Sequence, residues 1–216
     1  MPVLITRALL LDMDGTLVNS DAVVERIWRR WSIEHGLDPE HTLRVAHGRQ
    51  GYSTMAELLP DRPMAENYAE NAALLAEETT DVEGVVPIAG APAFMLAIAE
   101  LPHALVTSAD EGLTQARMGA AGLAVPEVRV TAEQVGASKP APEGFLKGAA
   151  ELGFSPEECV AFEDSPAGVA AARAAGMRVI GVGPRAAALG PDAHLRDLTH
   201  VRVEALADGR IGLHIA

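Results

Sequence analysis

The 216-residue sequence contains a single cysteine, Cys159, and few basic residues. One cysteine cannot form an internal disulfide, and it cannot build a zinc site alone. Lys and Arg together number 17 against 30 Asp and Glu, which gives a formal net charge of −13. A charge of this sign repels nucleic-acid phosphates and anionic membrane surfaces, so we expect neither as a partner.

Long apolar runs are also missing. No uninterrupted stretch approaches the about 20 residues that a membrane-spanning helix needs. The N-terminal run Leu9–Leu11 is too short for the core of a signal peptide, and it leads directly into Asp12 and Asp14. We therefore predict a cytoplasmic protein, with one domain that carries a modest insertion. Nothing in the sequence predicts an oligomeric state.

Five short apolar runs, each ending at small or polar residues, predict β-strands. Most of the intervals between them contain alanine-rich segments with helical spacing. Continuous apolar strands that alternate with helices are typical of a parallel sheet covered on both faces, so we predict an α/β, Rossmann-like fold. The predicted strands are Ala8–Leu11, Ala104–Thr107, Val128–Val130, Cys159–Phe162 and Arg178–Val182. The predicted helices of this core are Ala91–Leu101, Asp110–Ala121, Pro142–Leu152 and Ser165–Ala175.

The interval after the first strand breaks this alternation. Four consecutive segments read as helices there, too many for one crossover between parallel strands: Ala22–His35, Pro39–Ala46, Tyr52–Leu59 and Met64–Thr80. We predict an inserted all-helical cap at residues 18–82 and a catalytic core formed by residues 1–17 and 83–216. Near the C-terminus, Asp208-Gly209 predicts a two-residue hairpin turn within residues 201–215.

Side chains that could bind ligands or take part in catalysis accompany the predicted strands. Because parallel strands expose their carboxyl ends at one edge of the sheet, these side chains are expected to converge there. Crowded carboxylates need a counter-charge, and hard oxygen ligands suit Mg²⁺. A lysine and neighbouring hydroxyls suit the oxygens of a phosphoryl group. The set predicts metal-assisted phosphoryl transfer. It comprises Asp12, Asp14, Thr107, Ser108, Lys139, Glu163 and Asp164.

These residues lie in segments that resemble, in order, the four motifs of the haloacid-dehalogenase superfamily. The helical insertion is similar to the type 1 cap of that superfamily. The chain further resembles its bacterial sugar and hexitol phosphatases, and its fungal phosphatases of 2-deoxyglucose 6-phosphate and glycerol 3-phosphate. The segments are Asp12-Met13-Asp14-Gly15-Thr16-Leu17, Thr107-Ser108, Lys139-Pro140 and Glu163-Asp164-Ser165-Pro166, with Ala46-His47-Gly48-Arg49-Gln50 in the cap.

The resemblance implies roles for the two N-terminal aspartates. Asp12 would be the nucleophile that forms an aspartyl-phosphate. Asp14 would protonate the departing alkoxide and then accept a proton from water, which requires that Asp14 begin protonated. Asp12, Asp164 and the main-chain carbonyl of Asp14 would hold Mg²⁺, with Glu163 nearby or bound through water.

The resemblance also implies the residues that bind the substrate. Lys139 and Thr107, or its neighbour Ser108, would bind the transferred oxygens. In the cap, His47, Arg49 and Gln50 would contact the substrate. All three residues lie in the predicted loop between two cap helices. Arg49 and Lys139 would offset the carboxylates within the pocket.

The sequence therefore predicts an Mg²⁺-dependent phosphatase of small sugar or polyol phosphates. A phosphosugar mutase similar to β-phosphoglucomutase stays open, because it uses the same core residues. A haloacid dehalogenase is disfavoured by the second aspartate, Asp14, and a bacterial receiver domain by the order of the motifs. An inactive phosphate-binding protein is a further alternative. The choice between hexose, hexitol and glycerol phosphates is left open.

Overall fold

A computed structural model describes residues 3–215 of the chain. Within them, six parallel strands form the central sheet in the order β6-β5-β2-β7-β8-β9. The α/β prediction is confirmed, and no predicted strand end is displaced by more than one residue. The short outer strand β9 was not predicted. The strands are β2 Ala8–Leu11, β5 His103–Val106, β6 Arg129–Val130, β7 Cys159–Glu163, β8 Arg178–Val182 and β9 Ala193–Leu195.

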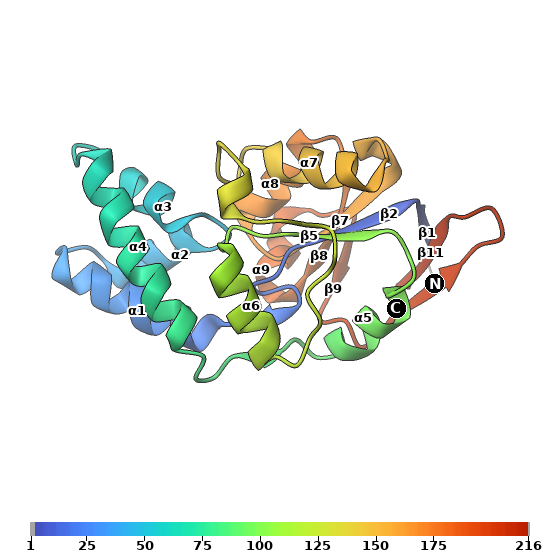
Figure 1. The fold of residues 1–216 in the computed structure, drawn as a ribbon, viewed down its shortest axis with the longest axis horizontal. Coiled ribbons are helices and arrows are strands. Elements are labelled where there is room, and N and C mark those ends of the chain that lie inside the picture. The colour runs from blue at the N-terminus through green and yellow to red at the C-terminus, as the bar shows by residue number, and fades with distance from the viewer. Residues whose placement is uncertain (1–2, 216) are drawn as a thin grey trace.

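Helices cover both faces of this sheet (Figure 1). Alternate residues of β2 enter two apolar clusters, since successive side chains of a strand point to opposite faces. Leu9 and Leu11 pack in the cluster that includes α5 and α6, whereas Ala8 and Leu10 pack in the cluster that includes α7 and α8. The helices of the core are α5 Ala91–Ile98, α6 Glu111–Ala120, α7 Glu143–Leu152, α8 Pro166–Ala174 and the short α9 Gly183–Ala186. Single 3₁₀ turns occupy Ala132–Gln134, Pro156–Glu158 and Ala187–Leu189.

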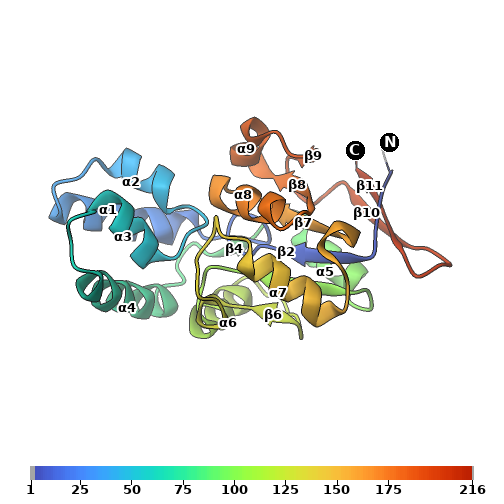
Figure 2. The same cartoon turned by 90° about the horizontal axis from the view of Figure 1, so that it is seen from above.

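Four further helices gather at one end of the molecule, beside the sheet and not on it (Figures 1 and 2). They are α1 Asp21–Glu34, α2 Pro39–Ala46, α3 Gly51–Leu58 and α4 Met64–Thr80. Below, "cap" denotes these helices together with the loops that connect them, and "core" the remainder. The cap's buried side chains, Ile27 and Trp31 among them, continue the apolar cluster of α5 and α6. The predicted cap limits at residues 18 and 82 remain a prediction.

Both chain segments that join the cap to the core take part in a small antiparallel pair. Strand β3 (Val18–Asn19) pairs with β4 (Val86–Pro87). The sequence analysis did not predict these two strands. The pair brings the entry and exit of the insertion side by side.

The two ends of the described chain share a separate three-stranded sheet, ordered β1-β11-β10. Its strands are β1 Val3–Thr6, β10 Val201–Ala205 and β11 Ile211–Ile215. The predicted hairpin is present, but the prediction of a two-residue turn was wrong. Leu206 donates its N–H to the Arg210 carbonyl at 2.8 Å, and Gly209 has a φ of +78°, so three residues form the loop. Across residues 3–215, no helix combines the length and apolar character needed to cross a bilayer.

Candidate active site

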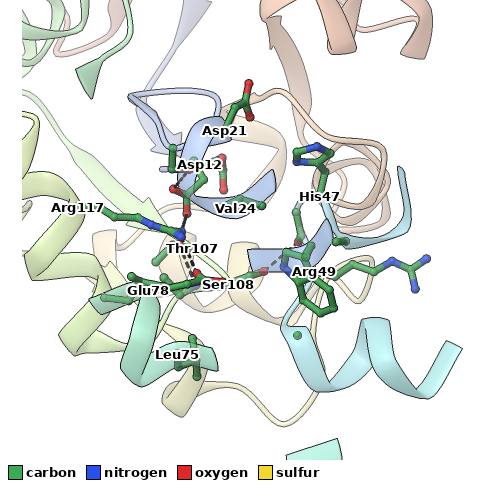
Figure 3. A pocket seen from close by; sticks show the side chains of 18 of the residues that line it. Asp12, Asp21, Val24, His47, Arg49, Leu75, Glu78, Thr107, Ser108 and Arg117 are labelled. Atoms are coloured by element: carbon green, nitrogen blue, oxygen red, sulfur yellow. Dashed lines mark hydrogen bonds and ion pairs between the residues drawn. The ribbon is translucent and has the colours of Figure 1, made fainter. Parts of the chain in front are cut away.

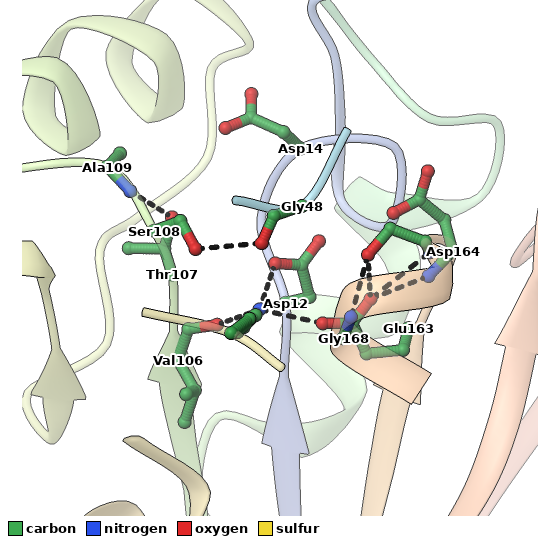
Figure 4. Close-up of polar contacts among 12 residues, drawn as sticks. Asp12, Asp14, Gly48, Val106, Thr107, Ser108, Ala109, Glu163, Asp164 and Gly168 are labelled. Atoms are coloured by element: carbon green, nitrogen blue, oxygen red, sulfur yellow. Dashed lines mark hydrogen bonds and ion pairs between the residues drawn. The ribbon is translucent and has the colours of Figure 1, made fainter. Parts of the chain in front are cut away.

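The site is built around Asp12, which follows the central strand β2 directly. Its N–H donates to the carbonyl of Phe162 in β7 at 3.0 Å, which continues the sheet pairing one residue further. Thr107 follows β5 and Asp164 follows β7, the two strands that flank β2. The carboxyl ends of these three strands therefore meet at one edge of the sheet, as expected (Figure 4).

Lys139 joins two of the acidic residues. Its Nζ lies 2.7 Å from Asp12 Oδ1 and 2.7 Å from Glu163 Oε1, and it donates to the Val106 carbonyl at 3.0 Å. The side chain is buried. Burial opposes the charged amine, but the attraction of Asp12 and Glu163 outweighs it and raises the pKa of Lys139 above its ordinary value. Lys139 is therefore a cation held between β2 and β7.

Glu163 is fully buried, and both of its carboxylate oxygens accept hydrogen bonds. Its Oε2 accepts from the N–H of Asp164 at 3.0 Å, and from the N–H and Oγ of Ser165 at 3.3 and 3.1 Å. A Cβ on Gly168, in the first turn of α8, would lie 1.7 Å from Glu163 Oε1. The helix start thus contacts a carboxylate at a glycine, where the helix dipole also favours negative charge.

Among the described residues, a carboxylate cluster that suits a metal ion is formed by Asp12, Glu163 and Asp164, with one oxygen of each within 4.8 Å of the others. Burial, and next the charge of Glu163, raise the pKa of Asp12 well above its ordinary value. The same two causes raise the pKa of Asp164 to about 7. Crowded, buried carboxylates of this kind fit a divalent cation, and their oxygen atoms suit Mg²⁺. Of the four predicted metal residues, Asp14 does not contribute its side chain to this cluster; its carbonyl stays a prediction.

Asp14 has its own set of partners. Its Oδ1 accepts from Ser20 Oγ at 2.6 Å, and its Oδ2 accepts from Arg117 Nη1 at 2.8 Å. Arg117 in turn donates from Nη2 to Glu78 Oε2 of the cap at 2.5 Å. Asp12 and Asp14 both line the pocket, yet each is held by a different cation. Figure 4 shows the two side chains apart from one another.

The two hydroxyl residues after β5 have different surroundings. Thr107 Oγ1 accepts the N–H of Ala109 at 3.0 Å, which leaves its hydroxyl hydrogen free to donate. Ser108 Oγ donates to the carbonyl of Gly48 in the cap at 2.9 Å. Both residues line the pocket. In this arrangement Thr107 is the better placed to bind a phosphoryl oxygen, while Ser108 connects the core to the cap.

The predicted cap residues divide into two groups. His47 and Arg49 line the pocket (Figure 3). Burial, and next the charge of Arg185, lower the pKa of His47. Arg49 forms an ion pair with Glu57 of α3, and in Figure 3 its guanidinium points away from Asp12. Its charge is here paired with Glu57, and its predicted offset of the site's carboxylates stays a prediction.

Gln50 is placed differently from the prediction. Its side chain is buried and donates from Nε2 to the Ala132 carbonyl at 3.2 Å, while its N–H donates to Ser138 Oγ at 2.9 Å. A buried amide needs such partners, and the core backbone supplies one. Gln50 therefore holds the cap loop against the core and does not face the pocket centre.

Two arginines of the site were missed by the sequence analysis. Arg117 lies on α6, and Arg185 follows β8. Arg185 donates from Nε to Asp164 Oδ2 at 2.9 Å, and its Nη2 lies 2.7 Å from the same oxygen in an ion pair. Its Nη1 donates to both oxygens of Asp21 at 2.9 and 3.0 Å. The strand-end rule, applied to β8, would have indicated Arg185. Arg117 lies four residues after the apolar Leu113 and therefore on the same helix face. A charged residue on an apolar helix face indicates a buried charge.

Comparisons with known proteins identify the family of the chain. The family model of the haloacid dehalogenase-like hydrolases matches residues 6–176. Hexitol phosphatase A of Escherichia coli (strain K12) is 43% identical over 82% of this chain and 82% of its own. Glycerol-1-phosphate phosphohydrolase 2 of Saccharomyces cerevisiae is 32% identical over 81% of this chain and 74% of its own. A solved structure of a putative β-phosphoglucomutase from Bacteroides vulgatus is 27% identical, with a TM-score of 0.75 over 90% of this chain and 85% of that one. The chain belongs to the haloacid dehalogenase-like hydrolases.

Proposed function

We propose that the protein is an Mg²⁺-dependent phosphatase of small sugar or polyol phosphates that acts through an aspartyl-phosphate. One observation carries the proposal. Asp12 stands at the carboxyl end of the central strand, paired with the buried cation Lys139, and it faces a pocket shared by the core and the cap. Such a carboxylate has a fixed orientation, a cation beside it and access to a bound ester.

In the first step, the Asp12 oxygen not paired with Lys139 attacks phosphorus in line with the ester oxygen. The new Oδ–P bond forms as the bond between phosphorus and the alcohol oxygen breaks. Asp14 gives its proton to the departing alkoxide, which leaves as the free alcohol. The Thr107 hydroxyl donates to a phosphoryl oxygen, and the developing charge is stabilised by groups fixed before the reaction.

In the second step, Asp14 accepts a proton from a water molecule as that water attacks the phosphorus of the aspartyl-phosphate. The Oδ–P bond breaks, inorganic phosphate forms and the carboxylate of Asp12 is restored. Asp14 is again protonated, which prepares it for the next ester. Its side chain, partly exposed and lining the pocket beside Ser20, is suited to both transfers.

Asp12, Asp164 and the main-chain carbonyl of Asp14 would hold Mg²⁺. Glu163 fixes Lys139 and stands next to these ligands. When bound, Mg²⁺ supplies positive charge that neutralises the acidic cluster and polarises the phosphoryl oxygens. Burial, and next the charge of Glu163, raise the pKa values of Asp12 and Asp164, and a bound cation would relieve the repulsion among these carboxylates.

The substrate class follows from the pocket and the relatives. On the cap side, the polar group of Asn71 lines the pocket among apolar ones such as Leu75. An amide suits the hydroxyls of a polyol, because it both donates and accepts hydrogen bonds. The 43% identity to a hexitol phosphatase supports a hexitol phosphate as the first candidate. The cap helices above the cleft favour compact esters over phosphoproteins.

A phosphosugar mutase is the second candidate, favoured by the similarity to the putative β-phosphoglucomutase structure. Both reactions use the same aspartyl-phosphate. They differ in the second step, where a sugar hydroxyl replaces water. A mutase therefore isomerises glucose 1-phosphate and releases little inorganic phosphate.

The proposal is tested by phosphate release from a panel of hexose, hexitol and glycerol phosphates with Mg²⁺, and again with a chelator. Glucose 1-phosphate is included and its products are identified. We expect phosphate release with Mg²⁺ and none with the chelator. Isomerisation without phosphate release would establish the mutase instead, and full activity in the chelator would contradict the metal assignment.

A further inference from the structure

A chain of three charged side chains runs from the cap to Asp14. Glu78 lies in the last part of α4 in the cap, Arg117 lies on α6 in the core, and Asp14 lies in the loop after β2. Arg117 donates from Nη2 to Glu78 Oε2 at 2.5 Å and from Nη1 to Asp14 Oδ2 at 2.8 Å. One guanidinium therefore spans the boundary between the cap and the core (Figure 3).

This cation is isolated from water. The Arg117 side chain is 4% exposed and that of Glu78 is 10% exposed. Among the residues that the structure describes, the Nε of Arg117 has no hydrogen-bond partner. Its orientation consequently depends on the two carboxylates that its terminal nitrogens contact. A planar guanidinium presents its donors in a rigid fork that sets the direction of each carboxylate, whereas an amine on a flexible stem sets these directions less strictly.

Asp14 itself is less constrained. It is 30% exposed, and its other side-chain partner is the Ser20 hydroxyl at the start of α1. Without Arg117, one oxygen of the carboxylate has a hydroxyl partner and the other faces the pocket. Without Glu78, Arg117 keeps one of its two anchors. Removal of either residue thus loosens the same carboxylate.

We propose that Arg117 is a positioning residue for Asp14, and that Glu78 fixes Arg117 in turn when α4 of the cap lies against α6. The inference rests on the proposed phosphatase function and extends it. The proton donor of the first step is in place only while the cap contacts the core. Ester cleavage is thereby linked to the arrangement that encloses the substrate.

The neighbouring Glu77 provides a matched control. It lies next to Glu78 in α4 and forms an ion pair with Arg30 of α1, at 2.6 Å, entirely within the cap. Both of these side chains are well exposed, so their pair contributes little to stability. Glu77→Gln removes the same charge from the same helix without touching Arg117.

The experiment compares two esters. A hexitol phosphate has a poor leaving group that needs a proton, whereas p-nitrophenyl phosphate has a leaving group that needs none. The ratio kcat/KM includes the departure of this group in both cases. We expect Glu78→Gln to lower kcat/KM for the hexitol phosphate about tenfold or more, since general acid catalysis contributes about 10²–10⁴. For p-nitrophenyl phosphate the fall should be less than about threefold, and Glu77→Gln should change neither value.

Substitutions of Arg117 give a second, independent series. Arg117→Lys should retain part of the hexitol phosphate activity and Arg117→Met less, with the aryl ester again less affected. Equal falls for the two esters would overturn the positioning role, and so would unchanged kcat/KM for the hexitol phosphate in Glu78→Gln. A wild-type protein that cleaves neither ester would overturn the proposed function, and this inference with it.

Discussion

Lys139 Nζ lies 2.7 Å from Asp12 Oδ1, although 127 positions separate the two residues in the chain. The same amine contacts Glu163 at the same distance. One cation thus compensates two buried carboxylates that come from the neighbouring strands β2 and β7. Lys139 therefore affects both the stability of this edge of the sheet and the reactivity of Asp12.

Replacement of this cation should destabilise the protein. Lys139→Met leaves Asp12 and Glu163 buried without it, and removal of one partner of a buried pair costs about 3–5 kcal/mol. We expect a loss of this size in the free energy of unfolding, measured by denaturant titration in a chelator, together with loss of turnover. Lys147→Met is the control, because the chain's other lysine is only half-buried and donates to the Gln134 carbonyl. Similar stability of the two variants would show that Lys139 is not required to balance the cluster.

The stability of the metal-free protein should fall as the pH rises toward neutrality. Burial and Glu163 raise the pKa of Asp164 to about 7, and burial and Glu163 raise that of Asp12. The folded state then binds more protons than the unfolded state at mildly acidic pH. The stability from these groups is complete below their unfolded pKa values of about 4, and for Asp164 it is lost as the pH rises through about 7.

Mg²⁺ should reverse this trend, since it binds the charged carboxylates. The rise in Tm that Mg²⁺ produces should be larger at roughly pH 8 than at roughly pH 6, as measured by thermal unfolding with and without chelator. The concentration of Mg²⁺ is kept the same in both buffers. An equal rise at the two pH values would contradict the assignment of Asp12 and Asp164 as its ligands.

Two helical glycines should respond in opposite ways to alanine. In Gly168→Ala, the new Cβ would lie 1.7 Å from Glu163 Oε1, so the carboxylate that holds Lys139 must move. Turnover and Tm should both fall. In Gly119→Ala the new Cβ meets nothing within 4 Å, and the free energy of unfolding should rise by about 0.5–1 kcal/mol. An active and stable Gly168→Ala variant would contradict the tight contact at the start of α8.

Gln50 should act on all substrates alike. Because its side chain contacts the Ala132 carbonyl of the core, Gln50→Ala should lower kcat/KM by a similar factor for each ester in the panel. The exposed Gln115, which contacts Glu111 on its own helix, gives the control variant Gln115→Ala. A changed ranking of substrates in Gln50→Ala would return Gln50 to the role that the sequence predicted for it.

The strand-end residues could be predicted because their position depends on a general rule. A run such as Ala8–Leu11 identifies a buried strand, and parallel strands bring Asp12, Thr107 and Asp164 to one edge whatever the length of the connections. Lys139 was assigned by its motif, and the structure places it at Asp12. For these residues, local pattern and topology together determine the location.

The cap side of the pocket could not be predicted in this way. The direction of Arg49 depends on Glu57 of α3, and that of Gln50 on a backbone carbonyl of the core. Arg117 and Arg185 each pair with a carboxylate of the cap, Glu78 and Asp21 respectively. A helix face or a strand end can indicate such a cation, but no periodicity in a single sequence indicates which cap carboxylate it contacts.

The central claim is that the Asp12 carboxylate itself receives the phosphoryl group. Asp14→Asn should slow hydrolysis of the intermediate while p-nitrophenyl phosphate still forms it, since that leaving group needs no proton. After incubation with this ester and Mg²⁺, acid quenching and peptide mass spectrometry should find one phosphoryl group on the peptide that contains Asp12. The double variant Asp12→Asn, Asp14→Asn should carry none. A phosphoryl group on another residue, or phosphate release by Asp12→Asn at the wild-type rate, would contradict the account.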